Sequence, residues 1–230
     1  MTLAKIDFSI VKGAVAQWES TDFEMQSRRF ESPKLYFVLV LYFRPIIRGG
    51  SMSNLVFIAC SIDGYIADRN DGLDWLQMIP NPDNLDMGWE KLNNRIDAII
   101  MGRNTFETVL SFNVPWPYDH PVFVLSNSMT SLPEEYKDKA EIINGDSKEI
   151  LEIMHQKGFS NLYIDGGVTV QNFLKEDLID EMIITTIPIL LGEGTPLFGG
   201  LPTELTFEHI KTEIFLDTIV QNHYIRKKYS

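Results

Sequence analysis

Two glycine-containing turns stand where a strand is expected to lead into a helix. One spans 101–105 (Met-Gly-Arg-Asn-Thr) after the apolar residues 98–100, and the other spans 165–169 (Asp-Gly-Gly-Val-Thr) after the apolar residues 162–164. A helix N-terminus offers unpaired N–H groups and a partial positive charge, and glycine lets backbone come close to a ligand. Two such turns in one small domain predict a clamp on the two phosphates of a dinucleotide. The chain lacks the Gly-x-Gly-x-x-Gly fingerprint of the doubly wound dinucleotide-binding fold.

Apolar runs that alternate with amphipathic segments predict the elements that position these turns. Strands that alternate with helices indicate a mainly parallel sheet covered by helices on both faces. The last two strands follow one another without a helix, so the predicted α/β fold has an antiparallel C-terminal edge. Strands are expected at 54–61, 98–101, 121–126, 140–143, 162–165, 181–188, 208–215 and 218–228, and helices at 86–95, 105–110, 147–157 and 169–174.

The composition is that of an acidic globular protein. The 230 residues are 44% hydrophobic and 23% charged, which fits one domain or at most two. A formal charge of −12 repels a phosphate backbone, so nucleic acid and anionic membranes are disfavoured as partners. The single cysteine, Cys60, is expected to be buried in a strand, and its isolation fits the reducing cytoplasm. No His, Cys, Asp and Glu residues have metal-ligand spacing, so no metal is expected.

The first 51 residues differ from the rest of the chain. They carry seven Lys/Arg and five Asp/Glu, and their apolar run at 35–43 is too short for a bilayer, which takes ~20 residues. The residues 48–52 (Arg-Gly-Gly-Ser-Met) are what a purine-rich ribosome-binding sequence would encode before a start codon. We therefore expect an upstream extension over 1–51, non-native or poorly ordered, and a functional domain over 52–230.

Four segments together resemble the dihydrofolate reductase fold family over residues 53–228. The most specific is Met-Gly-Arg-Asn-Thr-Phe-Glu at 101–107; the segments 58–66, 124–127 and 164–167 are informative only in this order. The same fold serves the reductase half of bacterial riboflavin-biosynthesis proteins and many bacterial dihydrofolate reductase-like proteins. The resemblance implies a dihydrofolate reductase-like domain that binds NADPH.

The resemblance assigns the two glycine turns to the pyrophosphate of NADPH. Arg103 would pair with the 2′-phosphate, which suits its guanidinium fork. Val168 replaces a second basic residue usual at that phosphate, so a preference for NADPH over NADH would rest on Arg103. One peptide bond of the second turn, Asp165–Gly166 or Gly166–Gly167, is expected to be cis. The cofactor-binding residues implied by the resemblance are Ala59, Ile66, Gly102, Arg103, Asn104, Thr105, Ser126, Asn127, Gly166, Gly167, Val168 and Thr169.

The resemblance also implies a catalytic pair. Asp86 has the family's spacing from the first glycine turn, and Thr185 falls where the acid of the family finds its hydroxyl partner. Together they would orient and protonate a substrate. A buried carboxylate needs partners or a raised pKa; the alternative is that Asp86 is only an N-cap on an exposed loop. The implied substrate pocket consists of Phe57, Trp89, Val109 and Ile164.

Two positions depart from the folate reductases of this family. Glu90 stands where they place an aromatic ring against the pterin, and His120 stands where an arginine holds the glutamate tail. Both changes make folate a poor substrate. Reduction of a ribosylated pyrimidine, as in riboflavin synthesis, would need basic residues for the substrate phosphate, and the loop 68–90 offers Arg69 alone.

The predicted function is that of an NADPH-dependent reductase that passes hydride to a small heterocyclic or conjugated substrate. The alternative is a non-catalytic nucleotide-binding protein, which would keep the glycine turns without needing Asp86. Burial of Asp86 would favour the enzyme, and exposure would favour the alternative. A structural role is disfavoured on the ground that packing does not need two glycine turns. A cytoplasmic location and a homodimer through the apolar C-terminal strands are further expectations.

Overall fold

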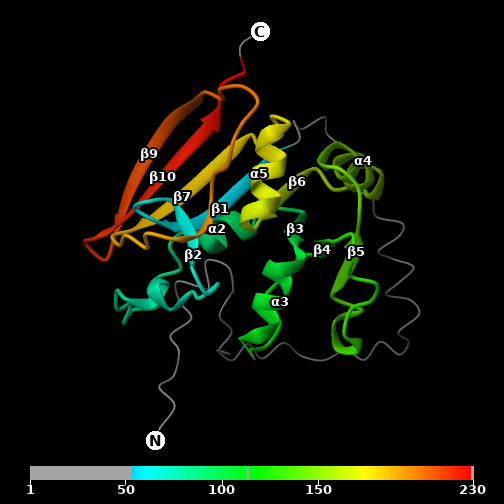
Figure 1. Ribbon diagram of the computed structural model, residues 1–230, viewed down its shortest axis with the longest axis horizontal. Coiled ribbons are helices and arrows are strands. Elements are labelled where there is room, and N and C mark those ends of the chain that lie inside the picture. Colours follow the sequence, from blue (N-terminus) through cyan, green and yellow to red (C-terminus); the bar gives the residue numbers. More distant parts are fainter. Residues whose placement is uncertain (1–52, 113, 229–230) are drawn as a thin grey trace, which may run out of the picture. The chain divides into compact units, whose positions relative to one another are not determined.

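The computed structural model describes residues 53–112 and 114–228 (Figure 1). The expected extension over 1–51 lies outside these residues. The boundary proposed between it and the functional domain stays a prediction.

A single large sheet forms the centre of the described residues. Its strand order is β5-β4-β3-β6-β1-β7-β10-β9. The neighbours from β5 to β7 are parallel, and β10 is antiparallel to both β7 and β9. This confirms the predicted α/β fold with a mostly parallel sheet and an antiparallel C-terminal edge. The strands are β1 Ser53–Ser61, β3 Ala98–Gly102, β4 Val122–Leu125, β5 Ala140–Ile143, β6 Asn161–Asp165, β7 Glu181–Ile187, β9 Phe207–Phe215 and β10 Ile219–Arg226, and a separate antiparallel pair joins β2 Tyr65–Asp68 to β8 Gly194–Pro196.

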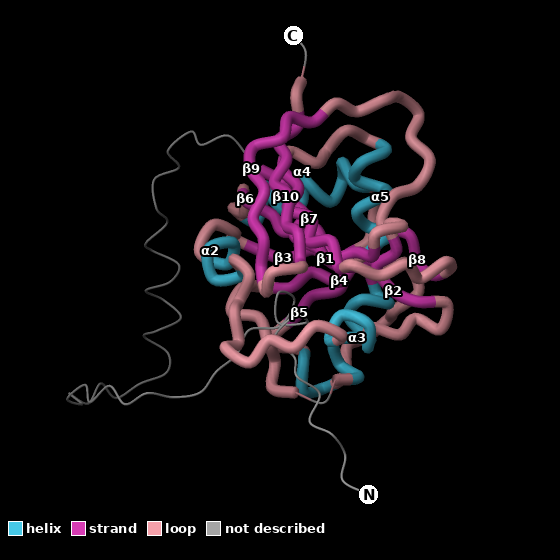
Figure 2. The backbone as a smooth tube through the Cα atoms, turned by 90° about the vertical axis from the view of Figure 1, so that its left-hand side faces the viewer, coloured by secondary structure: helices cyan, strands magenta, loops and turns pink. Residues whose placement is uncertain are grey.

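Alternation along the parallel strands divides the apolar side chains between two cores. Ile100 and Ile164 belong to the core packed under α4 and α5, whereas Ile99 and Tyr163 belong to the core packed under α2 and α3. Strands buried on both faces read as continuous apolar runs for this reason. Helices α2 and α5 lie on opposite sides of the sheet (Figure 2), which confirms the expected coverage of both faces. The helices are α2 Trp89–Asn93, α3 Arg103–Ser111, α4 Ser147–Lys157 and α5 Gly167–Lys175, with short 3₁₀ turns η2 Asp74–Gln77 and η3 Glu134–Tyr136.

The helix boundaries follow the local capping chemistry. Helix α4 has the predicted bounds because Asp146 and Glu149 form a capping box at its start and Gly158, at φ 91°, ends it. The helix expected over 86–95 is shorter, because Met87 and Gly88 adopt positive φ angles of 50° and 94° and the helix can begin only after them. No helix in the described ranges is both long and apolar enough to cross a bilayer.

The segment after α2 is fastened to β7 by an ion pair, and its loss should destabilise the fold. Arg95 donates to both carboxylate oxygens of Glu181, at 2.9 and 2.5 Å, and the Glu181 side chain is only 9% exposed. Burial opposes ionisation of Glu181, but Arg95 outweighs it and lowers the pKa of the carboxyl. Arg95→Met would leave this carboxylate buried without its main partner. We expect a loss of about 2 kcal/mol in the free energy of unfolding at pH 8, measured by urea denaturation.

The loss should be smaller at pH 5. There His223, whose Nε2 lies 2.8 Å from Glu181, can carry a proton and replace the lost cation. The control is Lys157→Met, which removes a more exposed pair with Glu141 and should cost under about 1 kcal/mol. Equal losses for the two variants would contradict a special role for the buried pair.

Candidate active site

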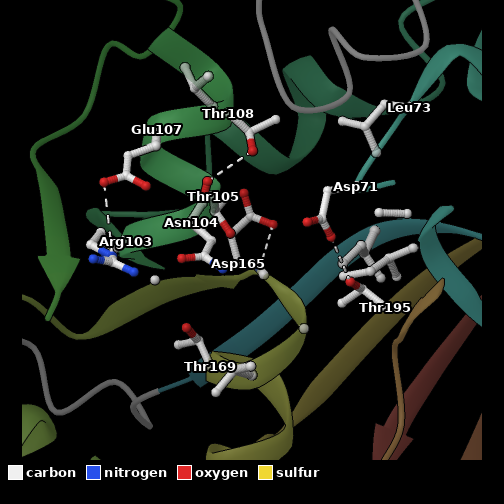
Figure 3. Close-up of a pocket in the computed structure, with 18 of the residues that line it drawn as sticks. Asp71, Leu73, Arg103, Asn104, Thr105, Glu107, Thr108, Asp165, Thr169 and Thr195 are labelled. Carbon is white, nitrogen blue, oxygen red and sulfur yellow. Dashed lines mark hydrogen bonds and ion pairs between the residues drawn. The ribbon is translucent and has the colours of Figure 1, made fainter. Parts of the chain in front are cut away.

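One cavity of about 820 Å³ opens at the carboxyl ends of the parallel strands. Ligands of open parallel sheets bind at this edge. Its walls come from β1, the loop after β2, α3, the end of β4, the start of α5 and β7. Every residue predicted to bind the cofactor lines it, as do Asp86, Thr185, Phe57 and Val109. The structure therefore gathers most of the predicted site around one space (Figure 3).

Two helices begin at this cavity without a capping side chain. Helix α3 has Gly102 and helix α5 has Gly166 at the N-cap, so neither N-cap residue has a side chain that could accept a hydrogen bond from the first-turn N–H groups. First-turn N–H groups and the positive ends of both helix dipoles are thus left for a ligand. Arg103 stands beside them, with Nη1 3.4 Å from the Ser128 hydroxyl and Nε 3.9 Å from Glu107. These donors fit the phosphates of a dinucleotide.

The two glycine turns pack reciprocally against each other. A Cβ at Gly166 would lie 2.2 Å from the Thr105 hydroxyl oxygen, and a Cβ at Gly102 would lie 3.0 Å from that of Thr169. Gly166 also has a φ of 88°, which side chains rarely tolerate. The expectation that packing does not need these glycines is therefore wrong at Gly166. The case for a ligand rests on the cavity and the uncapped helices instead.

The expected cis peptide bond is absent. All described peptide bonds are trans, including Asp165–Gly166 and Gly166–Gly167. Gly166 instead adopts a positive φ of 88°.

The predicted pairing of Asp86 with Thr185 does not form. Asp86 is exposed at the edge of the cavity, and its carboxylate accepts from the N–H groups of Gly88 and Glu90 at 3.0 and 2.9 Å. The Thr185 hydroxyl is buried and accepts from the Gln221 amide at 2.9 Å. Gln221 also donates to the Met87 carbonyl oxygen, so it joins the loop before α2 to β7. The sequence analysis did not identify Gln221 as a site residue, because a polar residue in a strand pattern does not indicate which side chain it will contact.

Two predicted pocket residues do not line the cavity. Ile164 faces the core under α4 and α5, because strand alternation points it away from its neighbours Tyr163 and Asp165. Trp89 is buried behind the wall, with its ring centroid 6.1 Å from that of Phe57 and 5.9 Å from that of Tyr163. Trp89 therefore supports the wall without touching the space.

Asp165 is the buried acid of the cavity. It is 6% exposed, lines the space between α3 and the loop after β2, and accepts from the Gly166 N–H at 2.8 Å (Figure 3). Burial raises the pKa of Asp165 to about 6, against the lowering effect of that hydrogen bond. Its signal was present in the sequence, as a carboxylate that directly follows a buried strand, but it was interpreted only as part of the turn.

Two tyrosines surround this acid. The Tyr163 hydroxyl donates to the Phe57 carbonyl oxygen at 2.9 Å and also interacts with the Asp165 carboxyl. The contact with Tyr163 lowers the pKa of Asp165 and so offsets part of the effect of burial. Within the described part of the chain, the buried Tyr118 hydroxyl has no hydrogen-bond partner. Burial raises the pKa of both tyrosines well above the usual value, so both stay neutral. Burial, and not the tyrosines, favours the protonated form of Asp165.

Metal and thiol chemistry have no visible basis in the described ranges. No group of three or more His, Cys, Asp or Glu residues there could hold a metal ion. Cys60 is 5% exposed, and burial raises the pKa of its thiol, which keeps it unreactive.

The fold and the cavity define a reductase-fold domain of the dihydrofolate reductase type. The chain belongs to the RibD C-terminal domain family, whose model matches residues 55–220.

Relatives support this assignment at different distances. The chain is 36% identical to the uncharacterized protein YwjB of Bacillus subtilis over 175 residues, which cover 75% of this chain and 97% of YwjB. It is 56% identical to a crystallised protein of Shewanella sp. PV-4 described as a candidate riboflavin biosynthesis protein, with a TM-score of 0.75 over 77% of this chain and 100% of that one. Dihydrofolate reductase of Enterococcus faecalis, solved with NADP(H), shares the fold at 17% identity, with a TM-score of 0.54 over 76% of this chain and 97% of that one.

Removal of the Asp165 charge should stabilise the protein, and only at higher pH. The native carboxyl, with its pKa of about 6 against an ordinary 3.8, keeps a proton that the unfolded chain releases. Native stability therefore falls as the pH rises from about 4 to about 6 and then levels off. Asp165→Asn keeps the acceptor for the Gly166 N–H without this penalty. We expect a gain of up to about 3 kcal/mol in the free energy of unfolding at pH 8 and little at pH 4.

Urea denaturation at the two pH values measures this gain. The control is Asp97→Asn, because Asp97 accepts from the N–H groups of Ser160 and Asn161 at 3.0 and 2.8 Å. That variant should lose about 1 kcal/mol at pH 8. A lower free energy of unfolding for Asp165→Asn at pH 8 would contradict the conclusion that the buried charge of Asp165 destabilises the native protein.

Proposed function

We propose that this protein is an NADPH-dependent reductase of small heterocyclic or conjugated substrates. The observation that carries the proposal is one cavity that joins two uncapped helix N-termini to a buried acid, Asp165. Bound in this cavity, NADPH would supply a hydride to the carbon of a C=N or C=O bond and become NADP⁺.

The glycine turns would hold the cofactor. The N–H groups at the starts of α3 and α5 would donate to its two linking phosphates, because both helix dipoles point their positive ends there. The Arg103 guanidinium, 45% exposed, would take the 2′-phosphate that distinguishes NADPH from NADH. Ala59 and Ile66, on β1 and β2, would lie against the nicotinamide.

Asp165 would supply the proton that must follow the hydride. Its Oδ1 accepts from Gly166, which leaves Oδ2 to carry the proton toward the nitrogen or oxygen of the reduced bond. With a pKa of about 6, Asp165 holds a proton in a useful fraction of molecules near neutral pH and can regain it from water in the open cavity. The Thr185 hydroxyl accepts from Gln221 and can donate to the substrate. Asp86 would orient the substrate from the edge of the cavity.

A non-catalytic nucleotide-binding protein is the second candidate. Asp86 is exposed, and the sequence analysis took exposure of this residue as favouring a non-catalytic protein. Asp165 outweighs that observation, because a nucleotide-binding module has no need of a costly buried carboxylate. Oxidation of bound NADPH by any substrate separates the two candidates. A cytoplasmic location, a homodimer, and the riboflavin-type or folate-type substrate stay predictions.

Cofactor binding tests the proposal most directly. NADPH should quench the tryptophan fluorescence of the full-length protein in a saturable manner. Arg103→Ala should weaken NADPH about 10- to 100-fold and leave NADH nearly unchanged, because a charge-assisted pair with the 2′-phosphate contributes about 1.5–3 kcal/mol. The control is Arg69→Ala, which removes a charge outside the cavity that pairs only loosely with Glu193, at 3.9 Å. Failure of NADPH to bind the folded protein would overturn the proposal.

The pH dependence of NADPH oxidation tests the role of Asp165. With any C=N or C=O compound that the protein reduces, the single-turnover rate should be highest below pH 6 and fall as the pH rises, since Asp165 then loses its proton. Asp165→Asn should slow the step about 100-fold or more while NADPH binding persists. A variant that keeps both the rate and its pH profile would exclude Asp165 as the proton donor.

A further inference from the structure

The charges around the cavity are almost all of one sign. Among the described residues that line it, Arg103 is the single basic side chain. The acidic side chains in the same lining are Asp71, Asp86, Glu107 and Asp165. The whole chain carries a formal charge of −12, so no long-range field offsets this local excess.

Arg103, the basic side chain of the lining, lies at the end of the cavity proposed to bind the cofactor. Arg103 opens α3, beside the uncapped helix start, and lies 3.9 Å from Glu107. Figure 3 places it with Asn104 and Thr105 on the α3 side of the cavity, with Asp71, Leu73 and Thr195 across from them. A substrate in the remaining space would have no cation to meet.

Two of the acids face that remaining space in fixed positions. Asp71 accepts from the Thr195 hydroxyl at 3.2 Å, and Asp86 is held by the N–H groups of Gly88 and Glu90. Neither forms an ion pair within the described part of the chain. Both are exposed, and both line the cavity together with an apolar wall. That wall is made by Phe57, Leu73 and Leu76.

Arg69 and His120, two basic residues considered for a substrate anion, are directed elsewhere. Arg69 is exposed and lies 3.9 Å from Glu193, outside the lining. His120 has its Nε2 2.8 Å from the Asn93 carbonyl oxygen and belongs to a separate shallow site with Lys137 and Lys139. A phosphate or a carboxylate tail on the substrate would therefore be desolvated against acids without a partner.

We propose that the substrate of this protein carries no phosphate or carboxylate and is a flat, neutral or cationic ring whose N–H donors face Asp71 and Asp86. This inference rests on the proposed function, because it assigns the cofactor to the Arg103 end. It separates the protein from reductases of phosphoribosylated pyrimidines and of folates, although the fold is shared. The apolar wall would pack against the flat face of the ring. The two carboxylates would accept hydrogen bonds from the N–H groups at its edge and disfavour a negative charge there.

A charge series of ring compounds of similar size tests this selection. Benzamidine is cationic, benzamide is neutral, and phenyl phosphate is anionic. Binding of each to the full-length protein is measured by calorimetry at pH 7 in the presence of saturating NADPH, which occupies the phosphate donors of the two glycine turns. Benzamidine should bind at least tenfold more tightly than phenyl phosphate, with benzamide between them. Asp71→Asn combined with Asp86→Asn should reduce that ratio to threefold or less, since each exposed pair contributes a modest factor.

The control variant is Glu152→Gln on the exposed side of α4, which should leave the ratio unchanged. Three results would each overturn the inference. Phenyl phosphate could bind as tightly as benzamidine, benzamidine could fail to bind, or the ratio of the two affinities could stay unchanged when the two aspartates are replaced. The NADPH titration by itself decides the proposed function. If the protein binds NADPH but prefers phenyl phosphate, the proposed reductase function stands and only the proposed substrate class is overturned.

Discussion

The reciprocal packing of two glycines against two threonines is the constraint on which the site depends. Gly166 lies against Thr105, and Gly102 lies against Thr169. Because β3 and β6 are hydrogen-bonded neighbours, their carboxyl ends meet, and the helices that follow must start almost in contact. A Cβ at Gly166 would collide with Thr105, and a Cβ at Gly102 would crowd Thr169. Two uncapped helix N-termini thereby reach the same space, and a single turn could not have built a site for two phosphates.

The same geometry explains why a costly acid stays at the centre. Asp165 is the last residue of β6, on the face opposite Ile164, so the strand alternation that buries Ile164 also turns the carboxylate into the cavity. Burial there disfavours its charge, and the pKa of about 6 measures that cost. The Gly166 N–H and the Tyr163 hydroxyl lower the pKa of Asp165, but together they do not offset the effect of burial. A buried, protonated carboxyl at the edge where ligands bind is destabilising at neutral pH, and such groups occur mostly at functional sites.

The sheet and most of the cofactor end could be predicted from sequence because local patterns determine them. Continuous apolar runs such as 162–164 locate buried strands, and the 101–107 motif places a helix start beside a basic side chain. The partner of Asp86 could not be predicted in the same way. It depends on the positive φ angles of Met87 and Gly88, which shorten α2, and on Gln221 from a strand far along the chain, which takes the Thr185 hydroxyl. The prediction of a cis peptide bond in the second glycine turn was wrong for a similar reason. A family resemblance indicates that a turn is present, but it does not determine the dihedral angles of that turn.

Fold and substrate are set by different residues in this protein. The strands and the two glycine turns lie within the residues that match the RibD C-terminal domain family, and with Arg103 they form the phosphate-binding end proposed for the cavity. Asp71, Leu73 and Leu76 come from the segment after β2, in which Leu76 is buried with Ile187 and Ile219 of the sheet while the carboxylate of Asp71 is exposed. Such a loop can change its charge without cost to the core. To the lining of the cavity this loop contributes the acid Asp71 and no base, so the charge of the substrate end is set by residues outside the glycine turns.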